Sequence, residues 1–177
     1  CRNSADAWVE PCLYHMNEQA GAPPDAFTAK GQNWGFPTYN WEAMQKDNFT
    51  WWRKRFDQMS NYFDAFRIDH ILGFFRIWSI PAHAVEGIMG RFMPAIPVSI
   101  NEIFSKSITF ERTRYTEPYV TDSILIDLFE DKKDEVKKTF FSGLKLKEKF
   151  NTQRKVEAYF KTDKTFDNKI KQGLYDL

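Results

Sequence analysis

The sequence predicts an α/β fold, with a helix and buried strands in the first part of the chain and short charged helices in the second. Residues 49–63 place large apolar side chains three and four positions apart, a spacing typical of a helix that buries one face. Residues 66–69 follow as a short segment suited to a buried strand. A helix that leads into such a strand is half of a β-α-β unit, the building block of parallel sheets.

Residues 1–46 are expected to be mostly loop. Gly21-Ala22-Pro23-Pro24-Asp25 and Gly35-Phe36-Pro37 impose turns or extended backbone and leave few places for a long helix. This segment is also rich in aromatic side chains. Because long loops with such a composition usually serve a function, we expect it to contribute to a binding site.

The predicted helix begins after Asp47, a suitable N-cap. Its apolar stripe consists of Phe49, Trp52, Phe56, Met59 and Phe63. After the strand at 66–69, Gly73 interrupts the pattern, and residues 74–80 form a second apolar run that ends at Pro81.

The rest of the chain is predicted to be helical and polar. Further short helices are expected at 84–92, 100–106, 122–129, 134–141, 152–160 and 165–172, the last with Gly173 as its C-cap. Residues 1–130 hold 12 basic and 16 acidic side chains, whereas residues 131–177 hold 13 and 8. The second region therefore presents a different surface, which is rich in lysine.

Composition narrows the class of protein. A chain of 177 residues with 42% hydrophobic residues can bury one core, and its net charge of +1 gives no general attraction to nucleic acid or to an anionic membrane. Its apolar stretches are too short to span a bilayer. Cys1 and Cys12 fit no metal-binding spacing, so we expect reduced thiols, no metal site and a cytoplasmic location. No secretory leader opens the chain, and both ends look like cuts inside a longer polypeptide.

The segment Arg67-Ile68-Asp69-His70 is the candidate catalytic site. Alternate residues of a strand share a face, so Arg67 and Asp69 are expected to point to the same side. A carboxylate beside a guanidinium stays ionised at neutral pH and can attack an electrophilic carbon. The alternative is a purely structural ion pair. His70 could bond a ligand hydroxyl or be an ordinary core histidine.

Residues 31–41, Gly31-Gln32-Asn33-Trp34-Gly35-Phe36-Pro37-Thr38-Tyr39-Asn40-Trp41, combine aromatic rings, side-chain amides and glycines. Sugar-binding sites use this combination, because rings stack on the sugar and amides bond its hydroxyls. A small aromatic core beneath a loop would have the same composition, and the segment alone does not decide between the two.

Four motifs together resemble the 4-α-glucanotransferases (amylomaltases or disproportionating enzymes) of glycoside hydrolase family 77. They are Ala22-Pro23-Pro24-Asp25-x-Phe27, Gly31-Gln32-x-Trp34-Gly35-x-Pro37-x-Tyr39-x-Trp41, Trp51-Trp52-x-x-Arg55 and Phe66-Arg67-Ile68-Asp69-His70-x-x-Gly73-Phe74. The resemblance covers residues 1 to about 100 in order and with family-like spacing, and the remainder only loosely.

The resemblance implies that the chain is part of a (β/α)8 TIM barrel with a mostly helical insertion. Residues 1–100 would be a partial catalytic barrel and residues 101–177 the lysine-rich insertion. The implied activity is retaining transfer of α-1,4-glucosyl or glucanosyl units between malto-oligosaccharides or glucans, without a cofactor. The sequence around Asn40-Trp41, residues 67–81 and the lysine-rich region most resemble the disproportionating subtype that processes maltose with a branched glucan.

The resemblance also implies residue roles. Asp69 would be the nucleophile, with Arg67 orienting it and His70 bonding the sugar. A loop that closes over the glucan would carry Asp25, Phe27, Gln32 and Trp34. Retaining chemistry needs a second carboxyl group. No segment like that of the family's acid/base Glu occurs before Leu177, so we expect the chain by itself to be inactive.

Two other classes of function remain open. A non-catalytic carbohydrate-binding module would use the tryptophans as stacking platforms and Asp69 only as a hydrogen-bond acceptor. A nucleic-acid-binding or scaffold protein would use residues 131–177, but the basic residues there are interleaved with acids and are not clustered as such a site requires. We expect a malto-oligosaccharide or glucan partner and neither nucleic acid nor membrane. The sequence specifies no oligomeric state.

Overall fold

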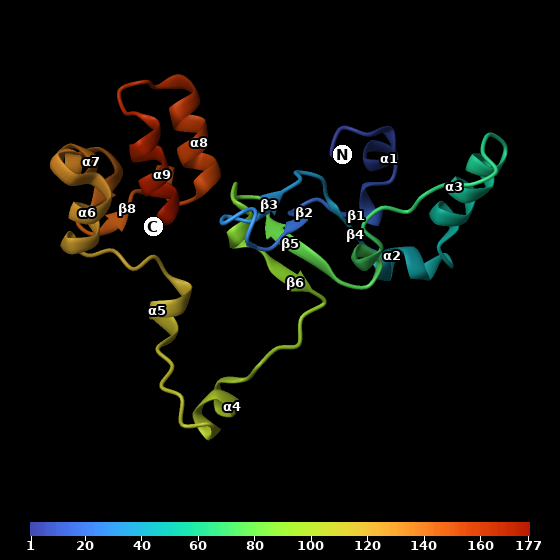
Figure 1. Ribbon diagram of the computed structural model, residues 1–177, viewed down its shortest axis with the longest axis horizontal. Helices are drawn as coiled ribbons and strands as arrows, with labels where there is room; N and C mark the ends of the chain where they lie inside the picture. The colour runs from blue at the N-terminus through green and yellow to red at the C-terminus, as the bar shows by residue number, and fades with distance from the viewer. The chain divides into compact units, whose positions relative to one another are not determined.

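The computed structural model describes residues 1–177 and divides into two compact units, Cys1–Ala95 and Ile96–Leu177 (Figure 1). The first unit contains both sheet and helix, and the second is mostly helical. The chain is therefore a mixed α/β fragment, and no barrel is shown. The predicted division after residue 100 lies near this boundary. The assignment of the two parts to a barrel and an insertion stays a prediction.

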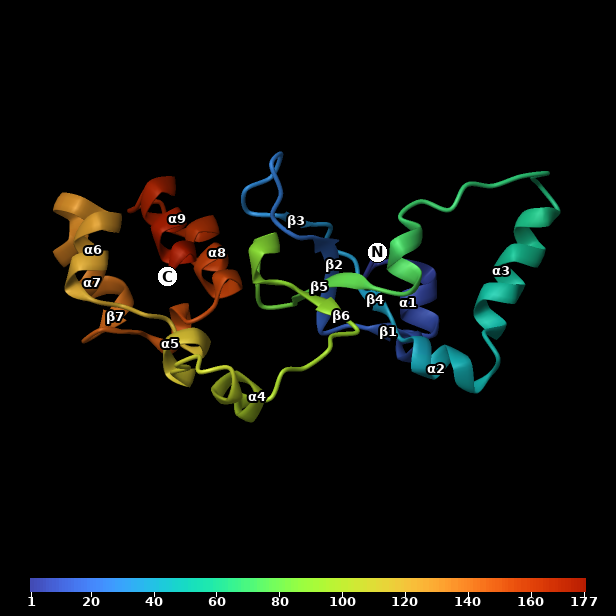
Figure 2. The same cartoon turned by 60° about the horizontal axis from the view of Figure 1, so that its bottom comes forward.

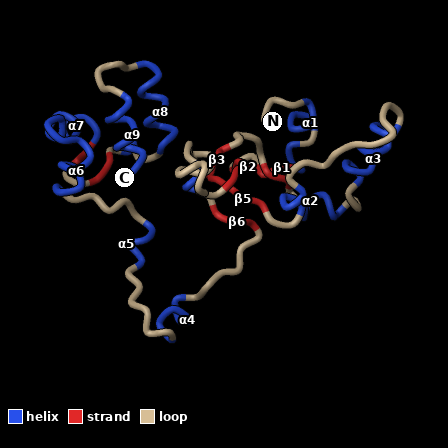
Figure 3. Tube along the Cα trace, viewed as in Figure 1, coloured by secondary structure: helices blue, strands red, loops and turns tan.

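A four-stranded antiparallel sheet forms the centre of the first unit (Figure 3). Its strands, in spatial order, are β3 (Gln32–Asn33), β2 (Glu18–Ala22), β5 (Ile77–Pro81) and β6 (Arg91–Met93). Ala20 pairs with Ser79 and Trp78 with Phe92 across the two main ladders. Strand β5 lies in the second apolar run, for which no element was named from the sequence. The expected parallel pairing is wrong for this sheet, because every ladder runs antiparallel.

Residues 1–46 contain more structure than the predicted loop. They form α1 (Ala5–Val9), the 3-10 helix η1 (Pro11–Leu13), β1 (Tyr14–His15), β2, β3, β4 (Thr38–Tyr39) and α2 (Trp41–Lys46). The prediction of mostly loop missed the strands because they form by pairing with residues distant in the sequence. Tyr14 pairs with Tyr39 in a second small sheet, for example. Ser4 and Asn40 cap the two helices with their side chains.

The predicted helix is present as α3 (Thr50–Ser60), which begins later than expected. Phe49 precedes it in the left-handed region with φ 58°, while the Asp47 carboxylate still accepts a hydrogen bond from the Thr50 N–H at 3.2 Å. The apolar stripe is only half-covered, since no residue of α3 is fully buried and Phe63 is 61% exposed. This unit therefore leaves much of its aromatic surface accessible.

Two elements predicted for this unit are wrong. Residues 66–69 form no strand and are exposed, because a strand needs hydrogen-bonded neighbours and the strands of this unit pair with one another elsewhere. His70 is left-handed (φ 52°) and precedes the 3-10 helix η2 (Ile71–Phe74). In place of a helix at 84–92 the chain forms the 3-10 helix η3 (Gly87–Met89) and strand β6, since pairing with β5 overrides the local pattern.

The second unit contains the predicted helices of the polar region. They are α4 (Ile100–Ser105), α6 (Asp122–Phe129), α7 (Lys133–Phe140), α8 (Gln153–Thr162) and α9 (Asn168–Asp176). The smaller elements are α5 (Arg112–Thr116), η4 (Glu130–Lys132), β7 (Phe141–Ser142), β8 (Lys145–Leu146) and η5 (Glu148–Phe150). Helix α4 begins with a complete capping box, in which Ser99 and Glu102 bond each other's backbone N–H groups.

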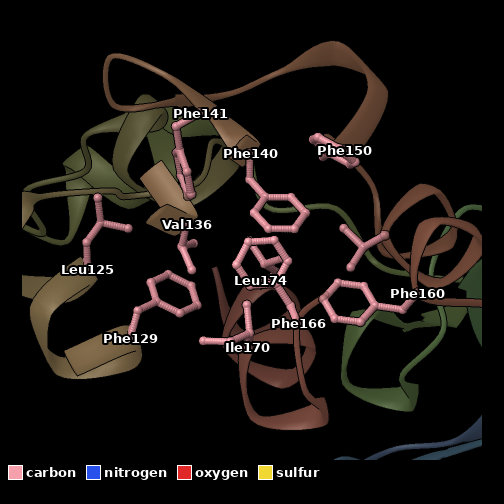
Figure 4. Close-up of a cluster of buried hydrophobic side chains, with 11 residues drawn as sticks. Leu125, Phe129, Val136, Phe140, Phe141, Phe150, Phe160, Phe166, Ile170 and Leu174 are labelled. Atoms are coloured by element: carbon pink, nitrogen blue, oxygen red, sulfur yellow. The ribbon is translucent and has the colours of Figure 1, made fainter. Parts of the chain in front are cut away.

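Eleven buried apolar side chains form the core of the second unit, mostly from α6, α7, α8 and α9 (Figure 4). They are Leu125, Phe129, Val136, Phe140, Phe141, Phe150, Val156, Phe160, Phe166, Ile170 and Leu174. The prediction that Gly173 caps the last helix is wrong. It lies inside α9, where an added Cβ would be 2.6 Å from Cε1 of Phe129. An alanine there would have to displace the Phe129 ring, because α6 and α9 pack closely, which sequence periodicity does not reveal.

The helices of both units are all too short or too polar to span a lipid bilayer.

Candidate functional site

A pocket of about 340 Å³ lies in the first unit. Its wall is formed by side chains of three segments that are distant in sequence: the loop around Trp34, helix α3 and residues 66–74. From these segments come Trp34, Phe36, Pro37, Thr38, Tyr39, Trp41, Trp52, Arg55, Phe56, Met59, Phe66, Arg67, Ile68, Asp69, His70, Gly73 and Phe74, with Ala20 and Ile77 from the sheet. The pocket is largely aromatic, and Asp69 is the single carboxylate among its lining residues.

Arg67 and Asp69 form an ion pair at the rim of the pocket. Nη2 of Arg67 lies 3.4 Å from Oδ1 of Asp69, and the two side chains are 88% and 89% exposed. A pair this accessible to water contributes little to stability. The ion pair instead orients the Asp69 carboxylate, because the guanidinium binds one of its oxygens and leaves the other open to the solvent. Both residues line the pocket, but they lie on irregular backbone, and Phe66 and Ile68 line it as well, so the alternation expected of a strand is absent.

Trp34 and His70 meet across the pocket. Their ring centroids are 5.0 Å apart with the planes near perpendicular, and Trp34 also stacks on Phe36 at 5.8 Å. The indole N–H of Trp34 donates to Oε1 of Gln32 at 3.0 Å, which fixes the ring orientation. Gln32 thus supports Trp34 and does not itself line the pocket.

Asp25 and Phe27 lie outside the pocket. The Asp25 carboxylate accepts hydrogen bonds from the Thr28 N–H at 2.7 Å, the Thr28 hydroxyl at 2.9 Å and the Phe27 N–H at 2.9 Å. These bonds, led by that of the Thr28 N–H, lower the pKa of Asp25. They form a tight turn at whose tip the Phe27 ring is 95% exposed. Asp25 is therefore a turn-forming residue in this structure, and Phe27 is presented to solvent.

An aromatic cluster backs the pocket and has Tyr39 at its centre. The Tyr39 ring lies 5.1 Å from Trp41, 5.2 Å from Trp52 and 5.7 Å from Tyr14. Burial is the main cause that raises the pKa of Tyr39, and it raises the pKa of Tyr14 to about 12. Both interpretations of residues 31–41 thus have a structural counterpart. Trp34, Phe36, Tyr39 and Trp41 all line the pocket, and Tyr39 and Trp41 also belong to the aromatic cluster behind it.

Arg55 lines the pocket, although no role was predicted for it from the sequence. Its guanidinium lies 5.2 Å from the Trp51 ring centroid, and Nη1 is 3.7 Å from Oδ2 of Asp6. The indole of Trp51 donates to the same carboxylate at 3.4 Å. Asp6 therefore ties α1 to α3. The only signal in the sequence was the presence of Arg55 in the third motif.

A second polar cluster that the sequence did not indicate joins three strands. The Ser79 hydroxyl donates to Oε2 of Glu18 at 2.5 Å, and Nη2 of Arg91 lies 3.1 Å from Oε1 of the same residue. These residues connect β2, β5 and β6 and do not line the pocket. In the structure, no three His, Cys, Asp or Glu side chains are placed so that they could hold a metal ion.

Tryptophan faces around a concave pocket with a few polar groups are typical of carbohydrate-binding sites. The comparison with known families gives the particular family: the model described as 4-alpha-glucanotransferase (glycoside hydrolase family 77) matches residues 1–168. The chain belongs to this family.

Curated relatives carry the same description. The 4-alpha-glucanotransferase DPE2 of Oryza sativa subsp. japonica is 45% identical over 187 aligned residues, which cover 99% of this chain and 20% of that protein. The chloroplastic/amyloplastic 4-alpha-glucanotransferase of Solanum tuberosum is 42% identical over 96 residues, covering 51% of this chain and 17% of that protein. The chain thus spans about a fifth of the length of these relatives.

Among solved structures, the amylomaltase from Streptococcus agalactiae in complex with acarbose aligns with a TM-score of 0.49 and 21% identity. The alignment covers 76% of this chain and 32% of that one. This likeness is too low to establish the barrel.

Proposed function

We propose that the whole protein is a retaining 4-α-glucanotransferase, and that this chain supplies its nucleophile and its glucan-binding loop. The substrates would be malto-oligosaccharides or α-1,4-glucans, between which glucosyl or glucanosyl units are transferred. Family membership supports this proposal. The observation that carries it is the pocket, which brings Asp69, Arg67, His70 and Trp34 together from two distant segments.

Asp69 would attack the anomeric carbon of the donor. The glycosidic bond breaks, the leaving oxygen takes a proton from a general acid, and a β-glycosyl ester forms on the carboxylate. A 4-hydroxyl of a second sugar then attacks the same carbon. It gives its proton to the group that acted as the general acid, and Asp69 is released as a carboxylate. Two inversions retain the anomeric configuration. We propose that the acid/base is a Glu of the whole protein outside this chain, since Asp69 is the single carboxylate lining the pocket.

The neighbours of Asp69 would bind and orient. Arg67 holds one carboxylate oxygen, so that the other faces the sugar. The imidazole of His70 can bond a sugar hydroxyl at the site of cleavage. Trp34 offers its ring to the glucan and keeps water from the ester, which favours transfer over hydrolysis. Asp25 and Phe27 would extend the same binding loop.

The finer assignments rest on sequence resemblance. We propose that residues 1–100 belong to a (β/α)8 barrel and that residues 101–177 begin an insertion in it. We also propose the subtype that processes maltose with a branched glucan. The two cysteines, which fit neither a disulfide scaffold nor a metal site, support a proposed cytoplasmic location. Net charge near zero supports a glucan partner and neither nucleic acid nor an anionic membrane.

A trapping experiment tests the nucleophile. The whole protein is incubated with a fluorinated maltosyl reagent, digested and mapped by mass spectrometry, and we expect the sugar on Asp69. Asp69→Asn should remain unlabelled and lose at least about 10⁴-fold in turnover, since covalent catalysis by this group is lost. A label on another residue would refute the assignment.

A second test concerns the chain by itself. The purified 177-residue chain should transfer no glucan, because no second carboxyl group lines its pocket to protonate the leaving oxygen. Chromatography of maltotriose incubations would detect disproportionation products, and their formation by the chain alone would contradict this expectation.

The second candidate function is a carbohydrate-binding module, which the aromatic lining of the pocket favours. The two candidates differ in what Asp69 does. If Asp69→Asn in the whole protein keeps full turnover while Trp34→Ala loses glucan binding, the module is the better description.

A further inference from the structure

Residues 85–88, a segment between β5 and β6, pack against residues 30–33. We call residues 30–33 the stem of the loop that carries Trp34. We name residues 85–88 the clamp and residues 23–36 the binding loop. Figures 1 and 2 show the two side by side, the binding loop in blue and the clamp in green. The motifs that indicated the site included the binding loop but no residue of the clamp.

Three polar contacts join the clamp to the stem of the binding loop. The Ile88 N–H donates to the Lys30 carbonyl at 2.7 Å, and the side-chain amide of Asn33 donates to the Val85 carbonyl at 3.0 Å. Nζ of Lys30 lies 3.8 Å from Oε2 of Glu86, whose side chain is only 12% exposed. All three contacts lie within four residues of Trp34.

Two glycines let the backbones touch. An added Cβ on Gly87 would collide with the Gln32 backbone nitrogen and lie 2.6 Å from the Gly31 carbonyl carbon. Gly31 has φ +66°, and a Cβ there would be 2.7 Å from the Ala22 carbonyl oxygen. Because these neighbours are all backbone atoms, no side chain can rotate away to make room. The contact therefore requires glycine at both positions.

The clamp is itself fixed to the sheet. The indole of Trp78 donates to the Gly87 carbonyl at 2.7 Å, and the Gln19 side chain donates to the Ala84 carbonyl at 3.3 Å. Strand β5 leads from the segment of Asp69 and His70 at one end to the clamp at the other. The binding loop and the nucleophile segment are thus held by one strand.

We infer that the clamp is a positioning element of the glucan site: it fixes the stem of the binding loop so that Trp34 stays against His70. This inference rests on the proposed function. The clamp residues do not line the pocket, so they act through Trp34 and not on the substrate. Detaching the stem should let Trp34 move away from its 5.0 Å contact with His70 and admit water.

The first test measures attachment of the binding loop in the 177-residue chain by amide hydrogen exchange. In Gly87→Ala, the Ile88 amide and residues 30–34 should exchange faster than in the wild type. The Val156 amide in α8 should remain as protected as before, which separates local detachment from unfolding. Gly143→Ala is the control for backbone strain without a steric clash, because an added Cβ there meets nothing within 4 Å while its φ of +65° disfavours alanine.

The second test measures transfer and hydrolysis by the whole protein. Gly87→Ala should raise KM for the acceptor and the share of hydrolysis roughly tenfold, as expected for a binding group displaced by part of an ångström. The rate of labelling of Asp69 by the fluorinated reagent should change far less, because the nucleophile is untouched. Glu86→Lys should have a smaller effect of the same kind, partly reversed by Lys30→Glu in the same chain.

The outcomes separate the inference from the function. Faster exchange with an unchanged ratio of hydrolysis to transfer overturns the positioning role, and so does unchanged exchange in Gly87→Ala. A wild-type protein without transferase activity overturns the proposed function and this inference with it. If Gly87→Ala does not fold, Glu86→Gln provides both measurements at smaller amplitude, and a wild-type result in both would overturn the inference.

Discussion

The two units differ in how they use their aromatic residues. In the second unit, Phe129, Phe140 and Phe160 are at most 7% exposed and belong to a closed core. In the first unit, Trp52 and Phe56 on α3 are only half-buried and line a pocket. The aromatic side chains of the second unit thus stabilise its core, whereas those of the first unit remain accessible to a ligand. A site built from rings needs a unit whose core does not bury them.

The largest expected effect is loss of the second unit's core in Phe140→Ala. Phe140 is fully buried and lies 4.7 Å from Phe150 and 5.2 Å from Phe166, so a cavity should cost about 3–5 kcal/mol. Far-UV circular dichroism in urea would report the change. All six tryptophans lie in the first unit, so tryptophan fluorescence should show an unchanged transition there.

The matched change in the first unit is Phe63→Ala. That side chain is 61% exposed, and we expect its removal to change stability by less than about 0.5 kcal/mol. Equal losses in the two variants would contradict the difference between the units.

Gly173→Ala should have the next largest effect. An added Cβ would lie 2.6 Å from Phe129 and push α6 and α9 apart, which should cost about 1–3 kcal/mol despite the better helix propensity of alanine. Urea unfolding followed by circular dichroism gives the value. Stabilisation by this substitution would show that Phe129 has room to move.

Alkaline pH should weaken the first unit through Tyr14. Burial raises its pKa to about 12 from the ordinary value of 10.0, so the folded state keeps a proton that the unfolded chain loses first. The stabilisation is complete below pH 10 and is lost as the pH rises through about 12. A tryptophan-fluorescence titration measures the loss, and Tyr14→Phe should reduce it. An identical titration curve in Tyr14→Phe would assign the effect to other groups, such as Tyr39.

The contrast between the units also explains what the sequence could predict. The helices of the second unit follow from patterns within a single segment, such as Thr121 before α6 and the spacing of Val136 and Phe140 in α7. Strand β2 and the irregular backbone at Asp69 depend instead on which distant segment supplies hydrogen bonds. Local periodicity contains no such information, so it found α3 and missed the antiparallel sheet.

The candidate site shows the same limit. Asp69, Arg67, His70 and Trp34 were named from their residue types and motifs, and the structure places all four on one pocket. Arg55 and the clamp were not predicted, because what they do depends on contacts with Asp6 in α1 and with the stem of the binding loop. Residue types indicate the chemistry of a site, whereas its supports become visible only in three dimensions.

The smallest effect on stability is expected for Asp25→Ala, because Asp25 is exposed and belongs to the core of neither unit. Asp25 and Phe27 are exposed, so urea unfolding of both units should match the wild type. The carboxylate nevertheless orders the turn, because it accepts two backbone N–H groups and the Thr28 hydroxyl. Since these bonds lower its pKa, the order should persist at neutral pH and be lost as the pH falls below about 4, the ordinary range of an Asp carboxyl.

Glucan binding by the whole protein should therefore weaken in Asp25→Ala at neutral pH while stability stays constant. Calorimetric titration with maltoheptaose measures the affinity, and Asp25→Asn, whose amide oxygen still accepts hydrogen bonds, should fall between Asp25→Ala and the wild type. Wild-type affinity in Asp25→Ala would mean that the turn and the exposed Phe27 ring lie outside the glucan site. The binding surface would then be confined to the pocket between Trp34 and α3.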